Sequence, residues 1–477
     1  MPDPAEDIFD ALFDGHVEFE PQSPLDEVLS KLPGRWCVYC FADGERRPVQ
    51  LLCVKNLRAS VRRRLGGVAE IDEPSRRINY REVIRHVYFR RVDGSLEQDL
   101  LYLDAARRLF PSQYRALVPD RPAWFICVDP DAMHPRFRVV SDPRIPADSD
   151  PSRRGVAGSS LGNDSRSATV RLFGPMSEKQ DATALVESLE DLFDLCRYHH
   201  LLMQSPDARA CPYKDMGRCP APCDGSITLD GYRALVHLAI RFLDDPETMI
   251  RQHELRMRQA ADELLFELAG SIRKLVEQMK SLTRGPYRLL RRMESLAFVA
   301  LQRGPRAWTF KLFLITPGSC EHELSLLVRG SELDGEVGGK RDAGVVGDRG
   351  SDVGNEKGAG VASRRGAGSD RRRGAGVAST RSAGVEEMVG GRLGSVVGSV
   401  LATRERLPRL PRDARAVDRL ACAVQHLLSA KTTARFIPLT GFDERSLAAA
   451  LRELLKAPSE PEAAPDDEGV VREGATA

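Results

Sequence analysis

Apolar residues in the first third of the chain fall in short runs that predict strands. Two of these runs, 36–41 and 49–54, are separated by a short charged stretch that contains a glycine. Such a pairing is typical of a β-hairpin. Two further runs, 124–128 and 137–140, also predict strands, and a basic segment with helical character begins at Lys55. We therefore expect an α/β chain, mixed in its order of helices and strands, with a small sheet near its N-terminus.

Later in the chain the apolar spacing changes to the three-residue and four-residue steps of helices. Residues 181–195 and 229–243 each present one apolar face. From Met257 to Met279 the apolar residues recur at steps of four, four, three, four, four and three, which aligns one stripe along a helix. Such a stripe predicts packing against a core or against a partner helix. The same reasoning predicts further helices at 289–301, 414–431 and 443–455 and strands at 308–315 and 322–328.

Length and composition predict two or three compact domains, since the chain has 477 residues and 42% of them are hydrophobic. One segment, 331–403, has too little apolar area to offset chain entropy and repeats Gly-Ala-Gly-Val-Ala-Ser, so we expect it to be a disordered tether. The predicted segments are an acidic tail (1–28), an α/β domain (29–115), strands and a flexible linker (116–168), a cysteine-rich domain (169–232), a helical segment (233–285), a small helix and strand region (286–330), the low-complexity segment (331–403), a helical region (404–456) and an acidic tail (457–477).

The ends and the charge of the chain predict a cytoplasmic protein with no membrane contact. The N-terminus is acidic and lacks the basic and apolar regions of a signal peptide, and no apolar run approaches the roughly 18 residues of a membrane span. A reducing cytosol disfavours disulfides. We therefore expect the scattered cysteines to be unlinked thiols: Cys37, Cys40, Cys53, Cys127, Cys320 and Cys422.

The stretch from residue 196 to residue 223 concentrates the candidate chemistry. Its four cysteines are spaced C-x14-C-x7-C-x3-C and are Cys196, Cys211, Cys219 and Cys223. Four thiolates in so short a stretch are typical ligands of a zinc ion or an iron–sulfur cluster. The Lys, Arg and Asp residues around them argue against a purely apolar core role for these thiols. The spacing leaves Zn²⁺ and a 4Fe–4S cluster open, with His199 and His200 as alternative ligands.

The run from Arg209 to Ile227, R-A-C-P-Y-K-D-M-G-R-C-P-A-P-C-D-G-S-I, resembles the cysteine region of UvrC, the nuclease subunit of bacterial nucleotide excision repair. Tyr232 follows it, and residues 173–176 stand where that family has F-G-P-Y. The resemblance implies that the four cysteines hold a 4Fe–4S cluster, with Zn²⁺ as the alternative. It covers roughly residues 29–330, and we find no counterpart of the family's ribonuclease-H-like nuclease or helix–hairpin–helix motifs.

The layout L-P-G-x-x-x-V-Y-x-F from Leu32, followed by a turn, a strand and K-N-L-R, resembles the GIY-YIG nuclease domain that begins UvrC. By this resemblance, Tyr39 matches the tyrosine of the first strand. The other catalytic positions would be Arg58 or Arg62 and the metal-binding Asp104, with Glu97 as a rival, acting with Mg²⁺ or Mn²⁺ on a phosphodiester.

Three positions depart from the GIY-YIG pattern. The tyrosine and glycine of the second strand become Gln50 and Leu52, and the helix arginine falls on Ser60. We therefore expect a nuclease fold whose catalytic site has degenerated. A divergent nuclease that makes a single incision is the alternative.

A basic surface on the same domain predicts DNA contact. From Lys55 to Arg91 there are eleven Lys and Arg residues against four acids, and such an excess can neutralise phosphates. A solvated helix face is the alternative. The candidate DNA-binding residues are Lys55, Arg58, Arg62, Arg63 and Arg64.

The run from Met257 to Val276, M-R-Q-A-A-D-E-L-L-F-E-L-A-G-S-I-R-K-L-V, resembles the UVR motif, a helical hairpin through which UvrC binds UvrB. The spacing alone predicts one helix, whereas the resemblance implies two. Gly270 and Lys274 replace the family's alanine and aspartate. The resemblance implies a UvrB-like partner, and an adaptor that binds another protein is the alternative. The candidate contact residues are Met257, Ala261, Leu265, Phe266, Glu267, Ala269, Ile272 and Arg273.

Overall fold

The computed structural model contains both helices and small, mostly antiparallel sheets, which confirms the predicted α/β class. Most of the predicted linker and most of the low-complexity segment, including its repeat, lie outside the described residues. Among the residues that are described, no helix is both long enough and apolar enough to cross a membrane. The structure describes residues 4–66, 80–118, 121–144, 170–306, 308–328, 387–389, 393–408, 410–429, 432–456 and 470–476.

The predicted hairpin forms the centre of the first sheet. Its two strands pair in antiparallel register, with Tyr39 opposite Leu52, and every residue of the first strand is buried. The sheet has the order β1-β4-β2-β3-β14, and all its pairings are antiparallel. Its strands are β1 (Gly15–Glu18), β2 (Cys37–Ala42), β3 (Pro48–Val54), β4 (His86–Arg91) and β14 (Val470–Thr476).

Alternate residues of β2 point to opposite faces of this sheet, so each face has its own core. Val38 and Cys40 lie in one core, with side chains of α1 (Pro4–Leu12) and α5 (Ser95–Leu109). Tyr39 and Phe41 lie in the other. That second core is completed by α2 (Leu25–Lys31), α3 (Leu57–Leu65) and residues around α4 (Tyr80–Val83).

Both predicted acidic tails contain elements of this first sheet, so the prediction of tails at 1–28 and 457–477 is wrong. Phe9 and Phe19 are buried, and the ring of Phe9 stacks on Tyr88 at 4.2 Å between centroids. At the other end of the chain, β14 pairs with the free edge of β3. A strand can form at these acidic ends with few apolar residues, because the edge of an existing sheet supplies its hydrogen-bond partners.

The second sheet carries the cysteine-rich region. It has the order β6-β5-β7-β8, and its core includes Phe173 and two helices, α7 (Lys179–Leu192) and α10 (Leu229–Asp244). Between these helices the chain forms only short turns of helix: α8 (His199–Leu202), α9 (Pro212–Asp215) and η3 (Pro222–Asp224). The strands are β5 (Trp124–Val128), β6 (Arg138–Val140), β7 (Arg171–Met176) and β8 (Arg291–Arg292).

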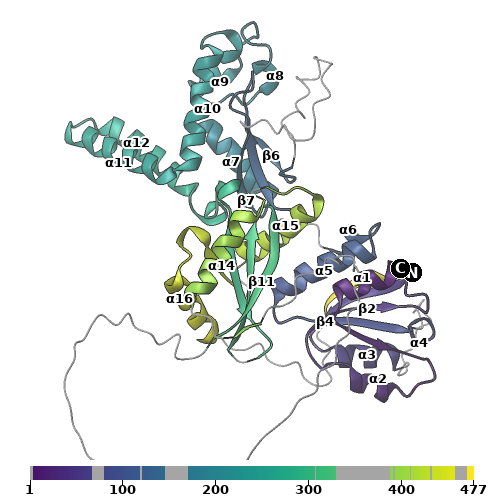
Figure 1. Ribbon diagram of the computed structural model, residues 1–477. Helices are drawn as coiled ribbons and strands as arrows, with labels where there is room; N and C mark the ends of the chain where they lie inside the picture. Colours follow the sequence, from purple (N-terminus) through teal and green to yellow (C-terminus); the bar gives the residue numbers. More distant parts are fainter. Residues whose placement is uncertain are drawn as a thin grey trace, which may run out of the picture.

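A hairpin of two helices, α11 (Pro246–Asp262) and α12 (Phe266–Ser281), projects from this body (Figure 1). The single helix that the spacing predicted is therefore wrong, and the two helices that the resemblance implied are present. The break comes at Leu264, whose φ of +61° is left-handed. A residue in this conformation ends a helix. Leu264 is neither a glycine nor a proline, so the usual sequence signal of a helix end is missing here.

The third sheet is assembled from residues 298–327 and the C-terminal region. Its order is β12-β11-β10-β9-β13, with α14 (Leu393–Arg406) and α16 (Glu444–Lys456) in the core of one face and α15 (Ala414–Leu428) in the core of the other. Helix α15 also contacts α5. The third sheet therefore packs on the first sheet and its helices, which together form the N-terminal body. The strands are β9 (Phe298–Arg303), β10 (Thr309–Thr316), β11 (Ser319–Leu327), β12 (Glu387–Val389) and β13 (Arg435–Pro438).

Two predictions fail in the third sheet. The helix expected at 289–301 is instead β8, the short turn η5 (Met293–Ser295) and β9, because pairing with β10 and β13 overrides helical spacing. The end of the segment expected to be disordered, 331–403, contains β12 and most of α14. Val396 and Val400 of α14 are buried in the core of this sheet, which supplies the apolar area that the segment lacks on its own.

Candidate functional site

The four clustered cysteines occupy the short turns between α7 and α10. Cys196, Cys219 and Cys223 are buried, and Cys211 is half-buried. The Cys196 thiol hydrogen-bonds the Cys219 sulfur, and Cys223 interacts electrostatically with both Cys211 and Cys219. The fold therefore brings all four predicted ligands into one neighbourhood.

The thiols influence one another's protonation. The hydrogen bond from Cys196 lowers the pKa of Cys219 to about 6, and the same bond together with burial raises the pKa of Cys196. Burial and the nearby Asp224 carboxylate raise the pKa of Cys223. The Cys219 sulfur therefore loses its proton more readily than an isolated thiol, and the thiolate is the form that binds metals.

The backbone around the cysteines is fixed by hydrogen bonds from outside the short turns. The Tyr232 hydroxyl accepts a hydrogen bond from the Cys196 N–H at 3.3 Å, and the Ala208 N–H donates to the Cys223 carbonyl at 3.0 Å. Ala221 has a left-handed φ of +53° between the last two cysteines. These contacts hold the loop in one conformation.

Charged side chains surround the turns that carry the four thiols. The Arg197 guanidinium lies over the Tyr213 ring at 4.2 Å and forms an ion pair with Asp191. Lys214 Nζ donates to Asp224 at 2.5 Å and to Ser226 at 2.7 Å, and its hydrogen bond lowers the pKa of Asp224 to about 2. Cations near a group of thiolates stabilise their negative charge.

The two histidines considered as alternative ligands have other surroundings. Within the described chain they are in neither of the groups of three or more possible metal ligands whose atoms lie close together. His199 Nε2 lies 3.2 Å from the His134 carbonyl oxygen, and His200 is exposed.

Tyr39, the first predicted catalytic residue, is fully buried beneath α3. Its hydroxyl is 2.8 Å from Ser60 Oγ, which also accepts from Arg64 Nη1 at 3.1 Å. Arg58 Nε and Nη2 both donate to the Leu32 carbonyl, at 3.1 and 2.8 Å. Gln50, at the position of the second-strand tyrosine, is buried and its Oε1 has no hydrogen-bond partner among the described residues.

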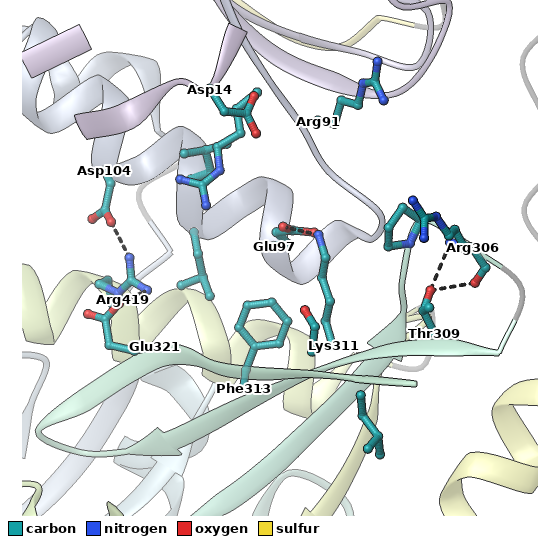
Figure 2. A pocket seen from close by; sticks show the side chains of 16 residues that line it. Asp14, Arg91, Glu97, Asp104, Arg306, Thr309, Lys311, Phe313, Glu321 and Arg419 are labelled. Carbon is teal, nitrogen blue, oxygen red and sulfur yellow. Dashed lines mark hydrogen bonds and ion pairs between the residues drawn. The ribbon is translucent and has the colours of Figure 1, made fainter. Parts of the chain in front are cut away.

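The predicted metal-binding carboxylates lie on the opposite side of the sheet. Asp104 on α5 pairs with Arg415 at 3.0 Å and with Arg419, both from α15. Glu97 accepts from Lys311 Nζ at 2.6 Å. Both carboxylates line a cavity of about 460 Å³ between the N-terminal body and the third sheet, and each faces a cation (Figure 2).

The catalytic positions that the resemblance implied, Tyr39, Arg58 or Arg62, and Asp104, therefore do not lie together in this structure. These residues are separated because they lie on opposite faces of the first sheet. Tyr39 points into the core beneath α2 and α3, whereas α5, which carries Asp104, covers the other face. The residue spacing alone did not show which face α5 would cover.

The predicted DNA-binding residues differ in exposure. Arg58, Arg62 and Arg63 are exposed on α3, whereas Lys55 and Arg64 are half-buried. Lys55 Nζ lies over the Trp36 ring at 5.4 Å, and Arg58 and Arg64 make the hydrogen bonds given above. A basic surface therefore remains on α3, and Arg58, although exposed, also hydrogen-bonds the Leu32 carbonyl.

The predicted partner-binding residues of the hairpin differ in exposure. Met257, Ala261 and Ile272 are half-buried, and Ala269 is likewise half-buried between the helices. Glu267 is exposed, and Arg273 is exposed and pairs with Glu277. At the tip, large apolar side chains are exposed to solvent: Leu264 (71%), Leu265 (48%), Phe266 (66%) and Leu268 (50%).

Two groups of neighbouring metal-ligand side chains were not predicted. Their members are His16, Glu18 and His86 in the first, and Asp99, Cys422 and His426 in the second. The local signals were weak: a His-x-Glu alternation on a strand, and a cysteine and a histidine one helical turn apart. Each group also needs a residue from a distant element, which spacing does not reveal.

The cysteine region is similar to a known protein family. Residues 155–242 match the UvrC/Cho excinuclease middle domain. The chain is also similar to proteins named UvrABC system protein C: it is 25% identical to that of Nautilia profundicola over 58% of this chain and 42% of the relative, and 24% identical to that of Wolinella succinogenes over 61% and 45%. With that of Corynebacterium jeikeium it shares 26% identity over 51% and 32%.

These matches confirm the resemblance to UvrC that was drawn from the sequence. The chain spans less than half the length of these curated relatives. No solved structure matches the chain.

Proposed function

We propose that this chain acts in nucleotide excision repair as a UvrC-like component that binds a UvrB-like protein and DNA. The observation that carries the proposal is the convergence of four cysteines within the stretch that matches the UvrC/Cho middle domain. In this proposal the cysteine region is a structural centre, the hairpin contacts the protein partner, and the N-terminal domain contributes DNA contact without incision.

The donor set fits a 4Fe–4S cluster held by Cys196, Cys211, Cys219 and Cys223. A tetrahedral zinc ion binds thiolates at about 2.3 Å, which separates the sulfurs by only about 3.8 Å. Among the described residues, no three of these sulfurs lie within 4.8 Å of one another. In a cubic cluster each thiolate binds a different iron, so wider spacing suits it better than it suits zinc. All four positions are thiols of the protein, which supports a structural role.

Loss of incision is supported by what surrounds the candidate catalytic residues. Tyr39 is buried against Ser60. Asp104 is neutralised by Arg419 of α15, and Glu97 by Lys311 of β10. A carboxylate in an ion pair of this kind is a poor ligand for Mg²⁺ or Mn²⁺, because the cation would first have to be displaced. The alternative, a divergent nuclease that makes a single incision, requires these pairs to open.

The partner role is supported by the tip of the hairpin. Leu264 and Phe266 are 71% and 66% exposed, although both are large apolar side chains, and Leu268 extends the same patch. Contiguous exposed apolar side chains mark protein interaction sites more often than they mark ordinary surface. UvrB-like proteins are the expected partner, and binding to another protein through the same tip is the adaptor alternative.

The test of function uses the full chain, a UvrB protein, Mg²⁺ and a duplex that carries a lesion. We expect complex formation without incision. Incision that disappears in Tyr39→Phe would support the nuclease alternative instead. Failure to bind either UvrB or DNA would leave the adaptor alternative and overturn the proposal.

A hairpin variant tests the route of partner binding. The double change Leu264→Ser and Phe266→Ser should weaken UvrB binding at least about tenfold, because exposed apolar anchors carry much of the binding energy at interfaces. Val83→Ser is the matched control, since Val83 is also an exposed apolar residue (41%) but lies on α4. Equal loss of binding in both variants would contradict a role for the tip.

Iron and sulfide analysis tests the cofactor. The wild-type chain should contain iron and acid-labile sulfide and have a brown absorbance, and Cys219→Ser should lose both. Cys422→Ser, a half-buried cysteine on α15, is the control and should retain them. A colourless chain that contains one zinc ion would reject the cluster while leaving the repair role standing.

A further inference from the structure

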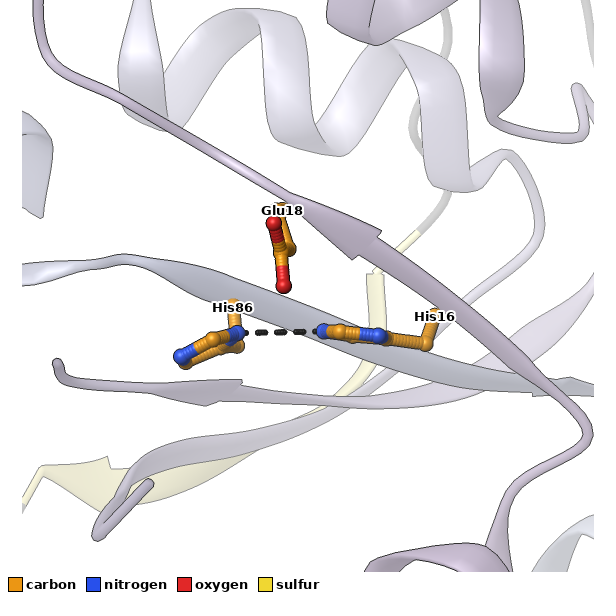
Figure 3. A group of neighbouring side chains, drawn as sticks. All are labelled: His16, Glu18 and His86. Atoms are coloured by element: carbon orange, nitrogen blue, oxygen red, sulfur yellow. Dashed lines mark hydrogen bonds between the residues drawn. The ribbon is translucent and has the colours of Figure 1, made fainter. Parts of the chain in front are cut away.

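Antiparallel pairing of β1 with β4 brings two histidines and a glutamate together. Glu18 lies directly opposite His86, and His16 is two residues before Glu18, so it shares the same face of β1. The His16 Nε2 and His86 Nδ1 atoms are 3.1 Å apart, and one ligand atom of each of the three residues lies within 4.8 Å of the others. Figure 3 shows the two imidazoles edge to edge with the Glu18 carboxylate above them.

Aromatic stacking fixes the orientation of one imidazole. The His16 ring stacks on Tyr88 with 4.4 Å between centroids and 11° between planes, and Tyr88 in turn stacks on Phe9 at 4.2 Å and 20°. Phe9 and Tyr88 belong to the buried core on that face of the sheet. A ring that is held this way loses little conformational freedom when its nitrogen binds a ligand.

These three side chains form a known type of ligand set. Two imidazole nitrogens and one carboxylate oxygen bind Zn²⁺ in sites that keep a fourth position open. With Zn–N bonds of about 2.0 to 2.1 Å, a tetrahedral ion separates two nitrogens by about 3.3 Å. The His16 Nε2 and His86 Nδ1 atoms are 3.1 Å apart, so a small movement of either ring brings them to that separation.

We propose that His16, Glu18 and His86 bind a divalent metal ion of the zinc class on the N-terminal sheet. Imidazole nitrogen favours Zn²⁺, Co²⁺ and Ni²⁺ over Mg²⁺ and Ca²⁺, which prefer oxygen ligands. His16 and Glu18 are exposed and His86 is half-buried, so the ion exchanges with solvent and keeps water in its open positions.

The site differs in place and chemistry from the cysteine centre and from the UvrC-like role proposed above. It joins β1, which follows α1, to β4 in the interior of the sheet. An ion bound here stabilises the packing of α1 and β1 on the sheet, because it has ligands from both β1 and β4. Metal binding free energy then adds to the stability of the β1–β4 pairing.

The test is a titration of the full chain with Zn²⁺, with the cysteine centre loaded, by calorimetry and by hydrogen exchange of the β1 amides. We expect one Zn²⁺ site of micromolar or tighter affinity, and slower exchange of β1 amides when it is filled. His86→Gln should weaken this site at least about tenfold, since changing a residue that only hydrogen-bonds a metal ligand already costs ten- to hundredfold in affinity. Mg²⁺ should produce neither effect.

Matched variants separate this site from others. His237→Gln changes an exposed histidine of α10 and should leave Zn²⁺ binding unchanged. Cys422→Ser removes a ligand from the second group, Asp99, Cys422 and His426, and should also leave it unchanged. Glu18→Gln keeps the shape of an exposed side chain, so it tests the site even if His86→Gln does not fold.

Three results would overturn the proposal. The first is the absence of a Zn²⁺ site of that affinity in the wild-type chain. The second is equal binding by wild type, Glu18→Gln and His86→Gln. The third is loss of the site in Cys422→Ser, which would assign the ion to α15.

Discussion

The N-terminal sheet and the cysteine region each contain a tyrosine that is almost completely buried, and the two hydroxyls differ in what they support. Tyr39 bonds Ser60 Oγ at 2.8 Å, which ties β2 to α3 within one core. Tyr232 accepts the N–H of Cys196 at 3.3 Å, which ties α10 to the first of the clustered thiols. The first hydroxyl contacts a helix of its own domain, whereas the second holds a candidate ligand in position.

Charged residues differ between the two regions in the same way. In the N-terminal body, Asp104 is directed away from Tyr39 and pairs with Arg415 and Arg419 of α15, which packs on the third sheet. In the cysteine region, Lys214 and Asp224 pair with each other beside Cys223. Residues that resemble a nuclease site thus hold domains together, while residues that resemble a metal site remain grouped around the thiols.

The largest expected effect tests whether Asp104 is structural. Asp104→Ala should lower the free energy of unfolding by about 3–5 kcal/mol, because it leaves the Arg419 guanidinium, only 7% exposed, without its closest carboxylate. Urea unfolding of the full chain measures this loss. If Asp104 instead served a catalytic metal, its removal would leave stability unchanged or raise it.

A double variant controls for the general cost of a change at this interface. Asp104→Leu combined with Arg419→Met removes both charges and keeps apolar volume. Replacing a whole buried ion pair in this way is often neutral. The double variant should therefore be more stable than Asp104→Ala alone, and equal destabilisation would contradict the ion-pair explanation.

The next effect compares the two tyrosines directly. Tyr232→Phe leaves the buried N–H of Cys196 without an acceptor and should cost about 1–3 kcal/mol of unfolding free energy. It should also speed the loss of the group bound by the cysteines, measured as the decay of its absorbance with a chelator present. Tyr39→Phe should cost about 1 kcal/mol through the lost hydrogen bond to Ser60 and leave that decay unchanged.

Each tyrosine variant serves as the control of the other. If both speed the decay equally, general destabilisation explains the result and the contrast between the regions disappears. If only Tyr232→Phe does so, the hydroxyl holds the ligand loop in a way that packing alone does not explain.

Local signals predicted the elements that depend on neighbouring residues. The hairpin at 36–54 follows from two apolar runs around a short turn, and α3 begins where Asn56 caps it by accepting from the Ala59 N–H at 3.1 Å. The four cysteines lie within one short stretch, so their convergence needed only short turns. Elements of this kind were predicted correctly because few distant contacts decide them.

Elements that depend on distant partners were missed. Residues 298–303 have helical spacing but form β9, because β10 and β13 flank them. Strands β1 and β14 come from acidic ends of the chain and form because β4 and β3 offer free edges. The separation of the catalytic positions has the same origin: the resemblance implied a helix at Asp104 but did not reveal that α15 would lie against that helix.

The smallest effect concerns Gly270, where the resemblance to the UVR motif has alanine. Gly270 lies exposed in α12, and an added Cβ would meet no atom within 4 Å. Glycine in a helix interior costs about 0.5–1 kcal/mol relative to alanine, because its unfolded chain has more freedom to lose. Gly270→Ala should therefore raise the free energy of unfolding of the hairpin by about that amount, measured as slower hydrogen exchange of α12 amides.

Gly94→Ala is the contrasting variant: its added Cβ would lie 2.5 Å from Gln302 Oε1, so it should destabilise the N-terminal body. A stabilising Gly94→Ala, or a destabilising Gly270→Ala, would show that backbone freedom and local space do not govern these two sites.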